Sequence, residues 1–124
     1  MNQKNILVGN SYPMSLIRRE VHICPEDIGV FRSVLAAAKQ IHSFWGHSNT
    51  LVAASAVAGV DLAPRTERSA LSLASEGYPQ LNEVVFSCCW LLSPQYKTNF
   101  RPQIGEEVDA AMIVNWQVLK MEWV

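Results

Sequence analysis

The sequence predicts a single α/β domain with a mixed sheet of about five or six strands and about three flanking helices. The chain has 124 residues, which is the length of one domain. Short apolar runs alternate along it with segments in which apolar residues recur at helical spacing. No internal repeat, low-complexity tract or linker divides residues 1–124, so one domain accounts for the sequence.

The first part of the chain predicts three strands and one helix. Gly, Asn and Pro punctuate the loop after the first strand, and Pro25 followed by two acids is typical of a helix start. The predicted elements are a strand over 6–8, a loop over 9–14, a strand over 18–23, a helix over 26–39 and a strand over 41–45.

The middle of the chain predicts a helix of small residues followed by a strand. The helix spans 48–58, with Ser48 or Asn49 as its N-cap and Gly59 as the residue that ends it. The alternation in 68–73 predicts a strand. The segment 74–82 contains Gly and Pro and predicts a hairpin-type loop.

The last part of the chain predicts the centre of the sheet. Residues 83–92 form a nearly continuous apolar run, as expected for a strand buried on both faces. A polar segment bracketed by prolines, 93–102, predicts a functional loop. A helix over 104–114 and a strongly alternating strand over 116–124 complete the predicted domain.

The composition excludes several classes of protein. The net charge of -1 gives no basic field for long nucleic acid. No apolar stretch reaches the roughly 18 residues of a membrane span, and the polar start is not that of a signal peptide. Cys24, Cys88 and Cys89 are odd in number, and the last two face opposite sides of a strand. We therefore expect reduced thiols in a cytoplasmic protein.

Known cofactor and hydrolase motifs are absent from the sequence. There is no dinucleotide or phosphate-binding glycine motif and no nucleophile elbow. His22, His42 and His47 lack metal-ligand spacing with carboxylates or cysteines. We expect neither a metal nor a cofactor.

The segment Gly46-His47-Ser48-Asn49-Thr50 is the strongest candidate for a site. A strand that ends where a helix begins gathers free backbone N–H groups and the positive end of the helix dipole, which attract phosphate. A histidine there can transfer protons near neutral pH. From the residues alone, a lone histidine beside a glycine is more often structural, so the pattern reaches only an α/β domain with an anion corner.

Several segments in order resemble the viral anti-CRISPR ring nuclease family. Gly46 to Thr50 resembles the family's Gly-His-x-Ser-Thr signature, with Asn49 in place of its serine. Val8 to Tyr12 resembles its opening strand and Asn-containing loop, and Arg68 to Leu73 resembles its Arg-x-x-Val-x-Leu strand. The segment from Ile104 to Glu107 and the closing strand also resemble its last helix and strand.

This resemblance implies a homodimer that binds cyclic tetra-adenylate across its interface and cleaves it without a metal. The ribose 2′-hydroxyl would attack the adjacent phosphate, and His47 would be the general acid that protonates the leaving 5′-oxygen. Two-fold symmetry of a dimer matches a two-fold symmetric ring. The residues that would contact the ligand are Asn10, Ser11, Tyr12, Gly46, Ser48, Thr50, Arg65, Arg68, Tyr96 and Lys97.

One departure from the family leaves other functions open. The family carries a second arginine at the end of the central strand, whereas this chain reads Leu92-Ser93-Pro94-Gln95-Tyr96-Lys97. Lys97 or Arg101 could stand in for it, although a lysine is a point charge and not a planar fork. The alternatives are a sponge that sequesters a cyclic nucleotide immune signal without cutting it, or a protein-interaction module of a phage or mobile element.

Overall fold

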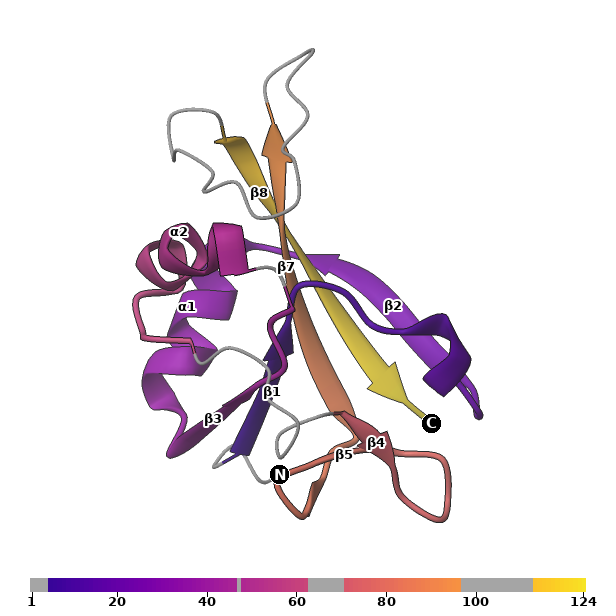
Figure 1. Cartoon of the computed structure of the whole chain (residues 1–124). Helices are drawn as coiled ribbons and strands as arrows, with labels where there is room; N and C mark the ends of the chain where they lie inside the picture. The colour runs from indigo at the N-terminus through magenta and orange to yellow at the C-terminus, as the bar shows by residue number, and fades with distance from the viewer. Residues whose placement is uncertain (1–4, 47, 63–70, 97–112) are drawn as a thin grey trace.

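The computed structural model describes residues 5–46, 48–62, 71–96 and 113–124 of the chain. Across these residues it is an α/β domain with two α-helices, a mixed five-stranded sheet and a separate three-stranded sheet, shown in Figure 1. The fold class predicted from the sequence is therefore confirmed. The elements are β1 (Asn5–Gly9), η1 (Met14–Leu16), β2 (Val21–Glu26), α1 (Ile28–Ala37), β3 (Gln40–Ser43), α2 (Ser48–Ala58), β4 (Ser72–Leu73), β5 (Pro79–Leu81), β6 (Val84–Val85), β7 (Cys88–Tyr96) and β8 (Ile113–Trp123).

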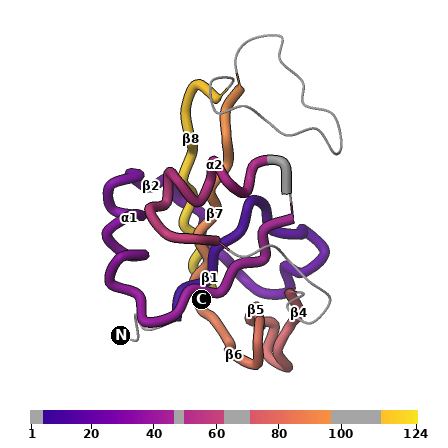
Figure 2. Tube along the Cα trace, turned by 60° about the vertical axis from the view of Figure 1, so that its left-hand side comes forward, coloured from indigo at the N-terminus to yellow at the C-terminus, as the bar shows by residue number. Residues whose placement is uncertain are grey.

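The five-stranded sheet has the order β2-β8-β7-β1-β3, with β7 at its centre as the sequence predicts. β1 pairs in parallel with both β3 and β7, whereas β8 pairs antiparallel with β7 and β2. The carboxyl ends of β1, β3 and β7 therefore meet at the same edge of the sheet. β7 and β8 extend beyond the other strands as a two-stranded ribbon (Figures 1 and 2).

The two faces of this sheet carry separate hydrophobic cores. Both helices lie on one face (Figure 1), where Phe31 and Leu35 of α1 and Ala54 of α2 pack against sheet residues such as Val8. The opposite face packs against the three-stranded sheet and the segment that follows β1. The alternation of side chains along a strand explains the division, since neighbouring residues point to opposite faces. Cys88 and Cys89 divide in this way, as the sequence predicts.

The helices begin and end close to their predicted limits. Asp27 is the N-cap of α1, and its carboxylate accepts hydrogen bonds from the backbone N–H groups of Gly29 at 2.8 Å and Val30 at 3.3 Å. α2 spans the predicted residues, and Gly59 ends it with a φ of 80° that favours glycine. The helix begins at Ser48, one of the two residues predicted as its N-cap, and the side chains of Ser48 and Asn49 lie outside the described part of the structure.

Four other predictions are corrected by the structure. The segment 74–82 is not a single loop, because it contains β5 and ends in a turn in which Asn82 and Glu83 have φ values of 52° and 66°. The apolar run 83–92 divides into β6 and β7. The predicted loop over 93–102 is wrong for 93–96, which continue β7. Residues 113–114 of the predicted third helix belong to β8, and its residues 104–112 lie outside the described part of the chain.

Candidate functional site

The candidate site lies where the carboxyl ends of β1, β3 and β7 meet, and we call this edge the corner. Its centre is the side chain of Asn10, which directly follows β1. The Asn10 Oδ1 atom accepts a hydrogen bond from the backbone N–H of Gly46 at 2.8 Å. The Ser93 hydroxyl on β7 donates a hydrogen bond to the Asn10 carbonyl at 3.2 Å. Asn10 therefore joins the end of β1 to the segment after β3 and to β7.

Gly9 allows β1 and the end of β3 to approach closely. The backbone N–H of Phe44 donates to the Val8 carbonyl at 3.0 Å, which continues the pairing of the two strands. A Cβ atom on Gly9 would lie 2.3 Å from the Phe44 ring, closer than any real contact. The loop after β1 therefore takes its position because position 9 has no side chain.

Trp45 and Thr50 join the end of β3 to the first turn of α2. The Trp45 Nε1–H donates to the Thr50 Oγ1 atom at 3.2 Å, and both side chains are buried, with Thr50 only 3% exposed. The Trp45 backbone N–H also donates to the Ser43 hydroxyl at 3.3 Å. The Thr50 side chain thus fixes the helix to the strand and is turned into the protein, whereas the sequence placed it among the ligand contacts.

The helix α2 begins two residues after Gly46 in the sequence. In a helix of 11 residues the first N–H groups lack intrahelical partners, and the dipole adds partial positive charge there. Gly46 is exposed, and a Cβ atom at this position would meet only Asn10 Oδ1, at 3.7 Å. A ligand with negative charge can therefore approach the backbone here. His47 and the side chain of Ser48 lie outside the described part of the structure.

Ser11 and Tyr12 have different surroundings although they are neighbours. Ser11 is exposed at the corner. Tyr12 is buried on the opposite face of the sheet, with its ring 6.4 Å from that of Phe44 and 5.2 Å from that of Trp123. Its hydroxyl lies 3.4 Å from the Leu16 carbonyl and donates to it, and burial raises the pKa of Tyr12 to about 12. Tyr12 is therefore a core residue whose ring faces other aromatic rings.

The remaining predicted contacts are only partly described. Tyr96 is the last residue of β7 and is half-buried, and this burial raises the pKa of its hydroxyl. The predicted phosphate contacts Arg65, Arg68 and Lys97 lie outside the described residues, as does Arg101. Sequence reasoning missed Ser93 as a corner residue, because only the pairing of β7 with β1 brings it beside Asn10.

Within the described ranges, no group of three or more histidine, cysteine or acidic residues is placed to hold a metal ion. None of the helices in those ranges has the length and apolar character needed to cross a membrane. Comparison of the chain with models of protein families and with curated proteins gives no match.

Proposed function

We propose that this protein binds a cyclic oligonucleotide, most favourably cyclic tetra-adenylate, at the corner of a homodimer and cleaves it with His47 as general acid. In this proposal it acts in the cytoplasm of a host cell and antagonises antiviral signalling, as the ring nucleases that it resembles do. The observation that carries the proposal is the contact between Asn10 and Gly46, which holds the ends of β1 and β3 beside the start of α2.

This geometry supports phosphate binding in the following way. The Oδ1 atom of Asn10 accepts a hydrogen bond from the Gly46 N–H. This bond fixes the orientation of the side-chain amide and therefore of its Nδ2 donor group. The N-terminal N–H groups of α2 are backbone donors that need no reorganisation when negative charge develops. Ser11, the residue after Asn10, adds an exposed hydroxyl. Together these groups form the kind of environment that stabilises a phosphate anion.

The proposed reaction needs one proton donor and no metal. The ribose 2′-oxygen forms a bond to phosphorus while its proton passes to solvent, and the bond from phosphorus to the 5′-oxygen breaks. The protonated imidazole of His47 gives its proton to that leaving oxygen. The products are a 2′,3′-cyclic phosphate and a free 5′-hydroxyl. Loss of a general acid typically lowers the rate by about 10²–10⁴-fold.

The test is incubation of the purified protein with cyclic tetra-adenylate and analysis of the products by mass spectrometry. We expect a linear product ending in a 2′,3′-cyclic phosphate, formed equally well with a chelator present. The variant His47→Ala should lose this activity, whereas His22→Ala, which removes an exposed histidine on β2, should retain it. Equal product from wild type and His47→Ala would exclude His47 as the acid.

One observation favours the alternative of a sponge that binds the ring without cutting it. Residues 92–96, where the family carries its second arginine, contain no arginine and are part of β7. Arginine stabilises the charge of a phosphoryl transition state, so its loss reduces cleavage more than binding. Calorimetry on the wild type distinguishes the two functions. A sponge binds cyclic tetra-adenylate tightly and releases it intact after denaturation.

A further inference from the structure

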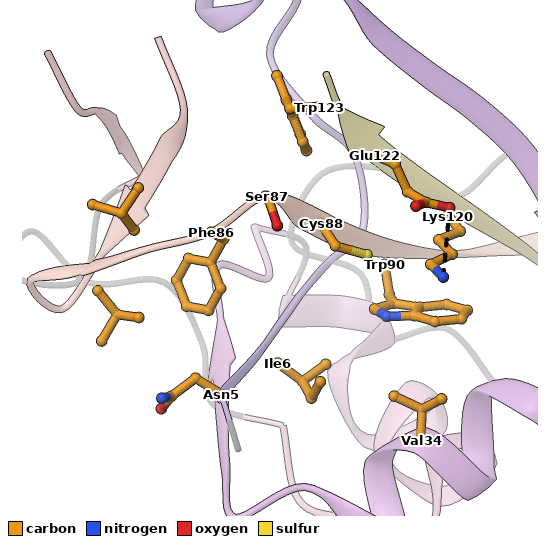
Figure 3. Close-up of a pocket in the computed structure, with 12 residues that line it drawn as sticks. Asn5, Ile6, Val34, Phe86, Ser87, Cys88, Trp90, Lys120, Glu122 and Trp123 are labelled. Carbon is orange, nitrogen blue, oxygen red and sulfur yellow. Dashed lines mark ion pairs between the residues drawn. The ribbon is translucent and has the colours of Figure 1, made fainter. Parts of the chain in front are cut away.

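A cavity of about 410 Å³ opens at the amino ends of β1 and β7, at the edge of the sheet opposite to the corner. Its volume lies in the range of roughly 300–1,000 Å³ that small-molecule sites occupy. Figure 3 shows its walls, which come from β1, α1, the connection from β6 to β7, and β8. The side chains that line it include Ile6, Val34, Phe86, Trp90, Lys120 and Glu122.

Part of the cavity wall is formed by buried apolar side chains, beside polar ones such as Asn5 and Ser87. Trp90 is only 4% exposed, and its ring packs on Phe31 of α1 with the ring centroids 5.7 Å apart. Ile6 and Phe86 are also buried, and Val34 is half-buried on α1. A site formed by buried side chains loses little conformational freedom when a ligand enters. Flat aromatic ligands suit such a surface, because aromatic rings pack well edge-to-face or offset against other rings.

Lys120 supplies a positive charge to the wall of this cavity. Its Nζ atom lies 5.3 Å from the centroid of the Trp90 ring and 3.5 Å from Glu122 Oε1. The Lys120 side chain is 30% exposed and that of Glu122 is 62% exposed, so the ammonium group lies toward the ring and the carboxylate toward solvent. The strand pairing places Lys120 beside Trp90 and Glu122 beside Cys88. The Cys88 thiol is uncharged at neutral pH because burial raises its pKa to about 11.

We propose that this cavity is a second ligand site, which binds a flat aromatic molecule carrying a carboxylate. The ring of the ligand packs between Trp90, Phe86 and Val34, and its carboxylate pairs with the Lys120 ammonium. A cationic head group is disfavoured, because Lys120 already occupies the position over Trp90 and Glu122 faces solvent. The proposal does not depend on the function of the corner, since none of these residues contributes to it.

The probe for this site is indole-3-propionate, and tryptamine is its matched cationic control. Both are titrated into isotopically labelled protein, and the NMR signals of the Trp90 indole and the Val34 methyl groups are followed. We expect saturable shifts with indole-3-propionate and at least tenfold weaker binding of tryptamine. Binding of tryptamine with equal affinity, or no saturable shifts with either compound, would overturn the proposal.

Three further variants separate the charge of Lys120 from its packing. Lys120→Met keeps an apolar stem along Trp90 and should weaken indole-3-propionate binding about tenfold, which is the expected effect of losing one charge-assisted hydrogen bond. Lys39→Met, an exposed lysine outside the cavity, should leave the affinity unchanged. Glu122→Gln should leave it unchanged or increase it. Unchanged binding by Lys120→Met, or a loss in Glu122→Gln as large as in Lys120→Met, would contradict the assigned charge preference.

Discussion

The corner and the opposite cavity use the two ends of the same strands and differ in almost every physical property. At the corner, Asn10 and Ser93 hold backbone groups together through hydrogen bonds. At the cavity, Trp90 and its apolar neighbours enclose space beside one ammonium group. Backbone donors at a helix start suit phosphate, whereas an apolar cavity with one cation suits an aromatic carboxylate. If both proposals hold, one pair of parallel strands presents two different binding chemistries at its two ends.

Among the substitutions at the corner, we expect Gly9→Ala to lower the stability of the protein the most. The new methyl group would lie 2.3 Å from the Phe44 ring, so the ring or the strand must move. We expect the free energy of unfolding to fall by about 3 kcal/mol, as for an overpacked core. Thermal unfolding followed by circular dichroism measures the change.

Gly46→Ala is the matched control for Gly9→Ala. Its Cβ atom would meet only Asn10 Oδ1, at the ordinary contact distance of 3.7 Å. The unfolding temperature of Gly46→Ala should therefore stay close to that of the wild type. An equal loss of stability in both variants would show that the close packing of Phe44 on Gly9 is not what positions the loop.

Asn10→Asp tests whether the corner binds an anion. The carboxylate keeps an acceptor for the Gly46 N–H, so stability should change by less than about 1 kcal/mol. The added negative charge should weaken binding of cyclic tetra-adenylate at least tenfold, since it opposes the ligand phosphates. Calorimetry at two salt concentrations measures this loss. Wild-type affinity in Asn10→Asp would place the phosphates elsewhere.

The smallest effect is a dependence of stability on pH through His42, which lies between the two regions. His42 is 2% exposed, its Nε2 atom lies 2.9 Å from Asn5 Oδ1, and Asn82 Nδ2 donates to its Nδ1 atom at 3.1 Å. Burial lowers the pKa of His42 below its ordinary value of 6.5. As the pH falls below that value, the unfolded chain binds a proton that the folded chain does not, so the free energy of unfolding decreases.

Denaturant unfolding at a series of pH values checks the role of His42. His42→Leu should be less stable at neutral pH, because Asn5 and Asn82 lose their partner, but its stability should decline less steeply as the pH falls. His22→Gln, which replaces an exposed histidine, should retain the steep decline of the wild type. If His42→Leu declines as steeply as the wild type, the acid sensitivity arises from other groups.

The sequence predicted those parts of the fold that depend on local pattern. The small residues between Trp45 and Gly59 predicted α2 over its full length, and the apolar run near Trp90 predicted the central strand. The continuation of β7 through Pro94 was not predicted, because proline usually ends a strand. It is tolerated because β1 pairs with β7 only as far as Leu91, so Pro94 has no described neighbour on that side.

The corner and the cavity also differ in how far apart their residues lie in the sequence. The corner could be proposed as a site from the sequence because Gly46 and the residues after it are contiguous and carry a recognisable pattern. The contact of Ser93 with Asn10 joins residues 83 positions apart, and no local pattern encodes it. The cavity was not predicted at all, because its walls come from segments as distant as Ile6 and Lys120. Pairing of strands that are far apart in sequence creates such sites.

The most direct measurement of the central claim is the product of cyclic tetra-adenylate after incubation with wild-type protein, His47→Ala and His22→Ala. We expect a 2′,3′-cyclic phosphate product from wild type and His22→Ala, and a rate lower by about 10²–10⁴-fold in His47→Ala. If all three proteins bind the ligand tightly and leave it intact, the protein sequesters the ring and does not cleave it. Absence of both binding and cleavage would contradict the function proposed for the corner.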